Sequence, residues 1–414
     1  MKSSSTIRTL DRYIGSFLCF VLSLVNALKR KRGDCDYKIE NILIIELFEM
    51  GASIMAYPSI HYIRKKFPDA KISILTTESI RASWLNITEI NSADIFTLKE
   101  NSIFDFLFSF YKNSKIINRK KIDVIIDFEL FYRITALFSF FIKANNKAGF
   151  FRYNLEGLYR GSIYNTHCHF NQNSHISRNF LALTKTALTF SREYPEYKNS
   201  IDVSELTYGL YSSKSSVLES LVKGKNISLN EPYIAVSPDV GPNLSCRNYP
   251  IEKLVLVITQ LLKKYPDYRI FLIGTKENLP ICEAIIASVS NERVLNLAGN
   301  TTMDELFEVL LNARLLISND NGPVHFAALT DTPTLALYST DSPFVYGSLG
   351  KCVILYSFYQ CSPCIMAYNH KNSLCTDNKC LQVISPETVV ESAVRILANN
   401  TKFRTINHET PYLY

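Results

Sequence analysis

Short apolar runs alternate along this chain with segments of helical pattern, and this alternation constrains the fold more than any other feature. The first run, residues 41–47 (NILIIEL), is typical of a strand buried on both faces. Helical patterns pass through Ile60 and Ile63 and start again at Ile103. Further strands are expected at 71–75, 93–98 and 121–128. This strand–helix order predicts parallel βαβ units.

The alternation weakens between about residues 165 and 230, where no clear strand is expected, and then restarts. We interpret the weak part as the end of a first domain and a linker. The second half is expected to hold helices at 251–264 and 303–312 and strands at 232–237, 268–273, 294–297, 314–317 and 334–338, the last clear one. The predicted fold class is therefore α/β, with two Rossmann-like doubly wound domains facing a central cleft. Ligands of such sheets bind beyond the carboxyl ends of the strands.

The composition fits two such domains and narrows the choice of partners. A chain of 414 residues, 47% of them hydrophobic, is long enough for two buried cores. Its formal net charge of +7 suits an anionic partner, such as a nucleotide diphosphate or an acidic membrane surface. The sequence has no long basic stripe interleaved with aromatics, no helix-turn-helix or RNA-binding signature and no Walker loop. Nucleic-acid binding and P-loop chemistry are therefore not expected.

An uncharged apolar segment, residues 13–28, lies between Arg12 and the basic run 29–32. At about 16 residues it is shorter than the ~20 of a spanning helix, and no small-residue cleavage site follows it. A helix lying in the membrane interface against anionic headgroups fits best, with a short span and a packed core helix as alternatives. The basic run is expected to keep the protein cytoplasmic, peripheral on the inner face of the cytoplasmic membrane.

The sharpest motif is ISNDNGPVH, in which a strand is expected to end and a helix to begin near Gly322 and Pro323. Proline suits the first helical turn because no N–H is needed there. Asp320 and Asn321 are expected to cap this helix, whose N–H groups and positive dipole end form a natural diphosphate site. His325, in the first turn, is placed to reach a phosphate. The alternative is an ordinary capped helix with a structural histidine.

Two other loops follow the first expected strand of each half. In the second half, VSPDVGPNLSCRNYP carries Arg247 just before a Tyr-Pro pair that opens a helix. An arginine there can neutralise charge on a leaving diphosphate without a metal, although taken alone it is more often a surface arginine. In the first half, ELFEMGASIMAYP has one glycine, Gly51, which is a weak phosphate signal.

With these loops the chain resembles glycosyltransferase family 9, the lipopolysaccharide heptosyltransferase family. The resemblance covers roughly residues 41–397. It is carried by ILIIEL with GASIMAYPSIHYIRKKFPDAKISIL, the turn from Arg247 to Pro250, LAGNTTMDELFEVL and, most specifically, SNDNGPVHFAALTDTPTLALYSTDSP. It implies a two-domain GT-B fold and an inverting, metal-independent glycosyltransferase that commonly uses ADP-heptose as donor substrate. The implied acceptor is a lipopolysaccharide or a related membrane saccharide.

The resemblance also implies roles for particular residues. Residues 320–325 would hold the donor diphosphate, and Arg247 stands where the family usually has a lysine that assists departure of the nucleotide. Glu277 would bind the donor ribose, and Thr301 with its neighbours would line the base pocket. Further donor contacts are expected from Gly51 and Ser237.

The general base is the position where the chain departs from the family. The family typically has Gly-Asp in the first loop, whereas here the pair is Gly51-Ala52, and alanine cannot take a proton. Glu49, on the same loop, is our candidate for the base that deprotonates the acceptor hydroxyl. Glu46 is the poorer candidate because it ends the strand. The alternative is that Glu49 is a surface or helix-capping carboxylate and that the enzyme is impaired.

Patterns typical of metal sites are sparse. The triplet Asp34-Cys35-Asp36, in the linker before the first strand, is interpreted as solvated. Six of the 10 cysteines are scattered, which argues against a secreted disulfide framework. The other four lie in a loop-rich segment, and in a reducing cytoplasm they fit either a structural zinc site or thiols without metal. They are Cys361, Cys364, Cys375 and Cys380.

The predicted organisation has five parts. They are a membrane-interface helix and basic linker at 1–40, an acceptor-side domain at 41–205, a linker at 206–230, a donor-binding domain at 231–400 with a Cys-rich loop at 361–380, and a tail at 401–414. The expected function is transfer of a heptose-like sugar from a nucleotide sugar to a glycolipid or saccharide. The alternatives are a catalytically impaired nucleotide-sugar-binding paralogue and a sugar-nucleotide epimerase of similar two-domain shape.

Overall fold

The computed structural model divides the chain into two compact units. Unit 1 comprises Met1–Thr207 and Ile365–Asn372, and unit 2 comprises Tyr208–Cys364 and Ser373–Tyr414. The structure describes residues 9–29, 38–87, 90–130, 132–151, 159–189, 200–201, 205–206, 210–225, 231–240, 246–366, 373 and 375–399. The triplet Asp34-Cys35-Asp36, most of the basic run 29–32 and the tail 401–414 therefore lie outside the described residues.

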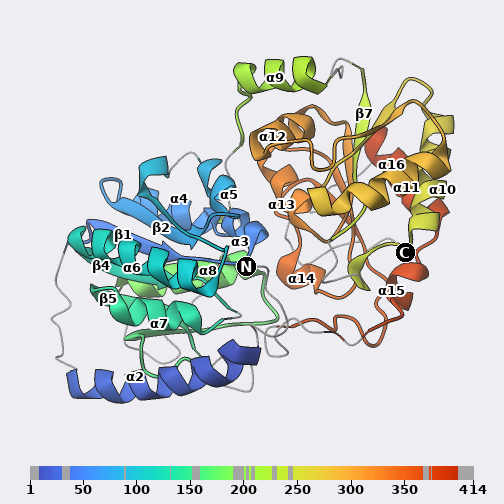
Figure 1. Ribbon diagram of the computed structural model, residues 1–414. Helices are drawn as coiled ribbons and strands as arrows, with labels where there is room; N and C mark the ends of the chain where they lie inside the picture. The colour runs from blue at the N-terminus through green and yellow to red at the C-terminus, as the bar shows by residue number, and fades with distance from the viewer. Residues whose placement is uncertain are drawn as a thin grey trace. The chain divides into compact units, whose positions relative to one another are not determined.

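Unit 1 is built on a six-stranded parallel sheet in the order β3-β2-β1-β4-β5-β6 (Figure 1). The strands are β1 (Asn41–Ile45), β2 (Lys71–Thr77), β3 (Ile95–Leu98), β4 (Ile122–Asp127), β5 (Ala144–Phe151) and β6 (Thr166–His169). The central strands β1 and β4 are buried on both faces, as their apolar runs predict. In their register Ile42 pairs with Val124 and Ile44 with Ile126.

Helices cover both faces of this sheet. On one face Phe110 of α6 stacks on Phe138 of α7 with ring centroids 3.8 Å apart, within the same core cluster as Leu43 and Ile125. On the other, α4 packs against α8. The helical segments are η1 (Asp11–Gly15), α2 (Ser16–Lys29), α3 (Met50–Met55), α4 (Tyr57–Lys66), α5 (Arg81–Leu85), η2 (Ser92–Asp94), α6 (Ile103–Arg119), α7 (Ile134–Phe141) and α8 (Ile176–Thr189).

Strand β6 corrects the expectation that no clear strand follows residue 165, and β5 lies where no strand was predicted. Strand β6, with the sequence THCH, is the edge strand and alternates buried with half-buried residues, so it has no continuous apolar run. Strand β5 begins with polar residues. One of them, Asn146, can be buried because both ends of its side-chain amide are hydrogen-bonded. Its Nδ2 donates to the carbonyl oxygen of Ala187 at 2.8 Å, and its Oδ1 accepts from Thr166 Oγ1 at 2.7 Å.

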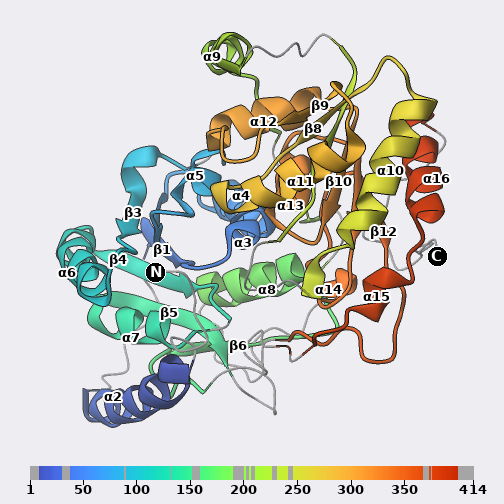
Figure 2. The ribbon, with the colours of Figure 1, turned by 45° about the vertical axis from the view of Figure 1, so that its right-hand side comes forward.

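Unit 2 repeats the architecture with the sheet order β12-β11-β10-β7-β8-β9 (Figure 2). The strands are β7 (Tyr233–Ser237), β8 (Arg269–Leu272), β9 (Val294–Asn296), β10 (Leu315–Asn319), β11 (Thr334–Leu337) and β12 (Cys352–Leu355). Strand β12 corrects the expectation that β11 is the last strand. Its apolar run is only four residues long, and periodicity does not distinguish so short a run from a buried loop.

The helices at 251–264 and 303–312 are confirmed as α10 and α12. The helical segments of unit 2 are α9 (Ser215–Lys225), α10 (Ile251–Lys264), η5 (Lys276–Asn278), α11 (Leu279–Val289), α12 (Met303–Asn312), α13 (Gly322–Leu329), α14 (Pro343–Tyr346), α15 (Lys379–Gln382) and α16 (Pro386–Leu397). Helix α9 lies in the range predicted as a linker. Just before it, Tyr211 stacks on Phe307 of α12 at 5.0 Å, and the N–H of Lys214 donates to Glu308.

Both sheets have the same strand order when the strands of each unit are numbered from its first strand, namely third, second, first, fourth, fifth and sixth. In each, the first strand of the unit lies next to the fourth: β1 beside β4, and β7 beside β10. Successive connections turn in opposite directions from this point, so the loops at the carboxyl ends of the two strands diverge and leave a place for a ligand. These two edges are where the candidate residues are to be sought.

Candidate functional site

Two loops meet at the carboxyl edge of unit 2, one after β7 and one after β10. Asn321 Nδ2 donates to Ser237 Oγ at 2.8 Å and to the carbonyl oxygen of Asp239 at 3.2 Å. Ser318 Oγ donates to Asn321 Oδ1 at 2.7 Å, and Asn319 Nδ2 donates to a backbone carbonyl of the β7 loop at 2.8 Å. The network joins the predicted donor residues Ser237 and Asn321 and holds both loops in place.

Helix α13 begins at Gly322 with Pro323 in its first turn, as predicted. The prediction that Asp320 and Asn321 cap this helix holds only for the N-cap position of Asn321, because neither side chain bonds to the first turn. Asn321 occupies the N-cap position, but its side chain bonds to the loop after β7, and the Asp320 carboxylate faces Arg247. Neither side chain takes the N–H groups of the first turn, and such a helix terminus suits an anionic ligand.

Arg247 is buried between two carboxylates and is not a surface arginine. Its Nη2 pairs with Asp341 and lies 3.5 Å from Asp320 Oδ2, and its Nε donates to Thr340 Oγ1 at 3.1 Å. The Arg247 side chain is 11% exposed and those of both aspartates 7%. Burial, with the charge of Asp320, raises the pKa of Tyr338 well above its ordinary value. The contacts with Asp320, Asp341 and Thr340 fix the orientation of the guanidinium without any ligand.

The other predicted donor residues also lie at this edge. Glu277 is exposed in η5, directly after β8, and Thr301 is half-buried in the loop between β9 and α12. His325 is buried in the first turns of α13. Asp239 ties two of the loops together, because its Oδ2 accepts from Asn278 Nδ2 at 2.8 Å.

Three glutamates lie at the carboxyl edge of unit 1, where β1 and β4 are neighbours. Glu46 follows β1 and is 1% exposed, and its Oε1 accepts from the N–H of Glu49 at 2.9 Å. Glu129 follows β4 and is also buried, with its N–H donating to Asp127 Oδ1 at 2.9 Å. Burial, and then the charge of Glu129, raises the pKa of Glu46 well above its ordinary value. Glu46 therefore keeps its proton to a higher pH than an exposed glutamate does.

Glu49 is the partly exposed member of this group. It occupies the N-cap position of α3, but its side chain does not cap the helix, so the helix-capping alternative is not what the structure shows. Gly51 lies in the first turn of the same helix, and Ala52 is buried. The partly exposed carboxylate of this group of three thus comes from the loop before α3.

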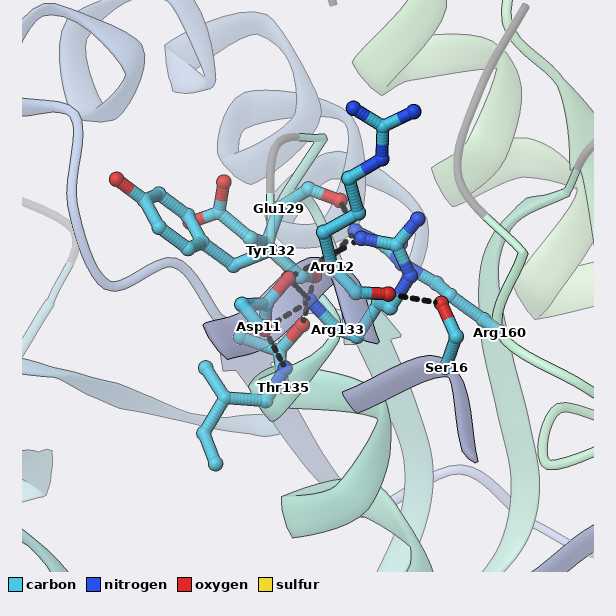
Figure 3. Close-up of polar contacts among 9 residues, drawn as sticks. Asp11, Arg12, Ser16, Glu129, Tyr132, Arg133, Thr135 and Arg160 are labelled. Carbon is cyan, nitrogen blue, oxygen red and sulfur yellow. Dashed lines mark hydrogen bonds and ion pairs between the residues drawn. The ribbon is translucent and has the colours of Figure 1, made fainter. Parts of the chain in front are cut away.

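A second buried polar group adjoins this edge and was not predicted from the sequence (Figure 3). Asp11, in η1, accepts from the N–H groups of Arg133 and Ile134 at 2.9 and 3.1 Å and pairs with Arg133 Nη1 at 3.3 Å. The buried Arg160 donates to the carbonyl oxygens of Glu129 and Tyr132, the latter at 3.0 Å. The loop that carries Glu129 is thus held by the N-terminal segment and by Arg160.

Comparison with known proteins identifies the family. The family model for glycosyltransferase family 9 (heptosyltransferase) matches residues 111–374, well over half of the chain. The chain belongs to this family. The glycosyltransferase is 22% identical over 300 residues to lipopolysaccharide heptosyltransferase 1 of Campylobacter coli, covering 72% of this chain and 83% of the relative.

Solved structures agree on the fold of the glycosyltransferase. The Escherichia coli ADP-heptose lipopolysaccharide heptosyltransferase II superposes with a TM-score of 0.67 at 18% identity, covering 87% of this chain and 99% of that one. The E. coli heptosyltransferase WaaC with ADP gives a TM-score of 0.61 at 16% identity, covering 86% and 99%. The two parallel-sheet units thus have the predicted GT-B fold, and family membership decides against an epimerase.

The predicted zinc site of the four late cysteines is not supported by their placement in the described part of the glycosyltransferase. Cys361 and Cys375 are exposed, Cys364 is half-buried and Cys380 is buried. Within the described part of the chain, no group of three or more His, Cys, Asp or Glu side chains is placed to hold a metal ion. Burial raises the pKa of Cys380 to about 11. Burial, followed by the charges of Cys364 and Cys375, raises the pKa of Cys246, which the sequence placed among the scattered cysteines.

Sequence reasoning missed several residues of both edges. Asp239, Asp341 and Glu129 each lie two to four residues beyond the end of β7, β11 or β4. A polar residue just past an expected strand was the signal that could have found them. Arg160 had no such signal, because it lies in the irregular segment between β5 and β6 and depends on contacts with a distant loop.

Proposed function

We propose that this enzyme transfers a heptose-like sugar from ADP-heptose, or a similar nucleotide sugar, to a lipopolysaccharide-type or related glycolipid acceptor. The observation that carries the proposal is the buried Arg247 beside the start of α13, where the side chains of Asp320 and Asn321 leave the N–H groups of the first turn unbound. Family membership supports it, as do relatives described as bound to ADP and to ADP-2-deoxy-2-fluoro heptose.

In the proposed reaction the donor diphosphate lies against the first turn of α13, with Arg247 beside the departing phosphate. Glu277 holds the ribose and Thr301 lines the base pocket, as expected from the sequence. The acceptor hydroxyl attacks the anomeric carbon as the bond to the phosphate oxygen breaks, so a single displacement inverts the configuration and releases ADP. The helix terminus and the guanidinium supply the positive charge that the leaving diphosphate needs, which is the basis for proposing metal independence.

We propose Glu49 as the base that takes the proton of the acceptor hydroxyl. A base must be ionised and within reach of its substrate, and Glu49 is partly exposed. Glu46 is the poorer candidate because its burial and raised pKa favour the protonated carboxyl, which cannot accept a proton. The competing proposal is a nucleotide-sugar binder without turnover, which the buried Ala52 supports.

The test is release of ADP from ADP-heptose by purified full-length protein, with a membrane glycolipid extract as acceptor. We expect Glu49→Gln to lower kcat by about 10²–10⁴-fold. Glu78→Gln is the matched control: it removes an exposed carboxylate after β2 on the same edge and should leave kcat unchanged. Activity should also persist in EDTA.

Each other outcome of this assay identifies a different error. Unchanged turnover in Glu49→Gln would retain the transferase and reject the base. Loss of activity in EDTA that magnesium restores would reject metal independence. Calorimetric binding of ADP-heptose by a wild-type protein that shows no acceptor-dependent turnover would favour the binder.

We also propose that the protein works on the cytoplasmic side of the membrane, held peripherally through residues 13–28. The apolar character of this segment and the basic run that follows it in the sequence support that location. The geometry of the late cysteines gives no support for a structural zinc, which is therefore not part of the proposal.

A further inference from the structure

The N-terminal helix is bound to unit 1 along one side. Its docked side carries Gly15, Cys19, Ser23 and Asn26, at helical spacing. Asn26 Nδ2 donates to the carbonyl oxygen of Ser162 at 2.8 Å, and the Ser162 N–H donates to Ser23 Oγ at 2.8 Å. Cys19 is fully buried in a cluster that includes residues of α7.

The fit along this side is close. Gly161 has a φ of +62°, and a Cβ there would lie 2.6 Å from the carbonyl oxygen of Cys19. The Asp11–Arg133 pair fixes the start of the segment, and both side chains are less than 10% exposed (Figure 3). The helix is therefore part of unit 1.

The opposite side of this helix is apolar and exposed. Tyr13, Phe17 and Leu24 are 66%, 64% and 55% exposed, and they lie on the side turned away from α7. The apolar side of a helix normally faces the core of its domain. Here the apolar side is the exposed one, and a row of exposed apolar side chains is typical of an interaction surface.

Helix α6, in the same helical layer, has a similar outer side. Phe104, Phe108 and Tyr111 are 86%, 57% and 53% exposed, whereas Phe106 and Phe110 pack into the core. In both views α6, α7 and α2 lie in a row on one side of the unit 1 sheet (Figures 1 and 2). We call the exposed side chains Tyr13, Phe17, Leu24, Phe104, Phe108 and Tyr111 the α2–α6 face.

Cations accompany these aromatic side chains. Lys112 Nζ lies 4.5 Å from the ring centre of Phe108, Lys115 Nζ lies 4.1 Å from that of Tyr111, and the Arg12 guanidinium lies 5.7 Å from that of Tyr13. The acidic residues of these two helical segments are engaged locally, Asp11 with Arg133 and Asp105 with Ser102. Aromatic rings with long cationic chains beside them are the arrangement that lies in a membrane interface, with the charges at the headgroups.

We propose that the α2–α6 face binds an anionic phospholipid surface, with α2 lying in the plane of the membrane. A second copy of the chain fits less well, because a two-fold contact would bring the same cations of both copies together. The stretch Asp11–Leu28 is long and apolar enough to span a membrane by length and composition. Spanning would, however, break the buried Asp11–Arg133 pair. This inference deepens the proposed membrane attachment and does not depend on the proposed reaction.

The test is co-sedimentation of the full-length protein with vesicles, with no donor or acceptor present. One set of vesicles is phosphatidylcholine alone and the other contains phosphatidylglycerol. We expect binding to the anionic vesicles, weakened at least tenfold by Phe17→Glu/Leu24→Glu and, separately, by Phe104→Glu/Phe108→Glu. Leu256→Glu, at a 51% exposed position on α10 of unit 2, is the matched control and should bind like the wild type. Circular dichroism confirms that each variant is folded.

Four results would overturn the proposal. Two of them are failure of the wild type to bind and equal binding to both sets of vesicles. The third is loss of binding in only one of the two double variants. The fourth is membrane-bound protein that resists carbonate extraction, which indicates a spanning helix. A change of oligomeric state in the variants without a change in vesicle binding would instead assign the face to a second copy. Because no turnover is measured, these results are independent of whether the sugar-transfer proposal holds.

Discussion

Arg247 shows how a buried charge is held in one orientation by its neighbours. Asp320, Asp341 and Thr340 hold its guanidinium from two loops, so the free energy of orienting a long side chain is spent during folding. Lysine, which the family usually has at this position, is a point charge with no planar fork. The two carboxylates beside Arg247 are the partners that such a fork requires.

Glu46 illustrates the opposite case, a buried carboxyl that costs stability when it ionises. Its folded-state pKa is raised by burial and by Glu129, whereas in the unfolded chain it titrates near 4.3. The folded state therefore binds more protons, and stability falls as pH rises from about 4.3 through the raised folded-state pKa. Below about 4.3 both states are protonated and the effect vanishes.

Glu46→Gln should therefore stabilise unit 1 by an amount that grows with pH. The amide oxygen can still accept the Glu49 N–H, and the variant cannot ionise. We expect little difference in melting temperature at pH 4 and a clear gain at pH 7.5, since each tenfold difference in proton affinity between the folded and unfolded states is worth about 1.4 kcal/mol. Fluorescence of Trp84, the single tryptophan and fully buried in unit 1, gives the measurement. Exposed Glu78→Gln is the control, and a gain independent of pH would contradict the linkage.

At the scale of elements, η1 and α2 act on the loop between β4 and α7. Asp11 accepts from two N–H groups at the start of α7 and neutralises Arg133 there. The same loop carries Glu129, whose charge acts on Glu46. A segment near the start of the chain thus helps to set the geometry of the edge of unit 1.

Asp11→Asn should destabilise unit 1 strongly, because it leaves the buried Arg133 without a carboxylate. We expect a loss of about 3–5 kcal/mol, followed by Trp84 fluorescence during urea unfolding. Asp94→Asn is the control: it breaks the more exposed Lys120–Asp94 pair and should cost about 0–1 kcal/mol. Asp11→Asn with Arg133→Met should regain much of the stability. Equal small effects of both single variants would show that the Asp11 pair contributes little.

At the scale of the molecule, each unit has a complete sheet and its own core. The cluster built on β7, β8, β10 and β11 contains only residues of unit 2, and the cluster built on β1 and β4 only residues of unit 1. Such units can unfold in separate steps, and a ligand of one stabilises that one.

Saturating ADP should therefore raise the melting temperature of one unit only. At about 100 times Kd the gain is about 2.7 kcal/mol. Because the proposed nucleotide site lies in unit 2, we expect a far-UV circular dichroism transition to shift while the Trp84 fluorescence midpoint stays fixed. An equal shift of both signals would show either that the two units unfold together or that ADP contacts unit 1.

Local periodicity was enough to predict much of this fold. The central strands are apolar on both faces, and the bounds of α10 and α12 follow from their repeats, so these elements could be located from neighbouring residues alone. The start of α13 at Gly322 was predicted because the backbone of the adjacent proline is already suited to a first helical turn. Edge strands such as β6 escaped prediction, since half of their residues face away from the core.

The sequence by itself determined the α/β class, the two-part organisation and the family, because these depend on local periodicity and contiguous motifs. Only the tertiary structure decided that the Asn321 side chain bonds to Ser237 and not to the first turn of α13, that Arg247 lies between two aspartates, and that Asp11 pairs with Arg133. Each of these contacts joins residues far apart in the chain. Their geometry and burial depend on which strands are neighbours in the sheet. The local sequence does not determine this strand order.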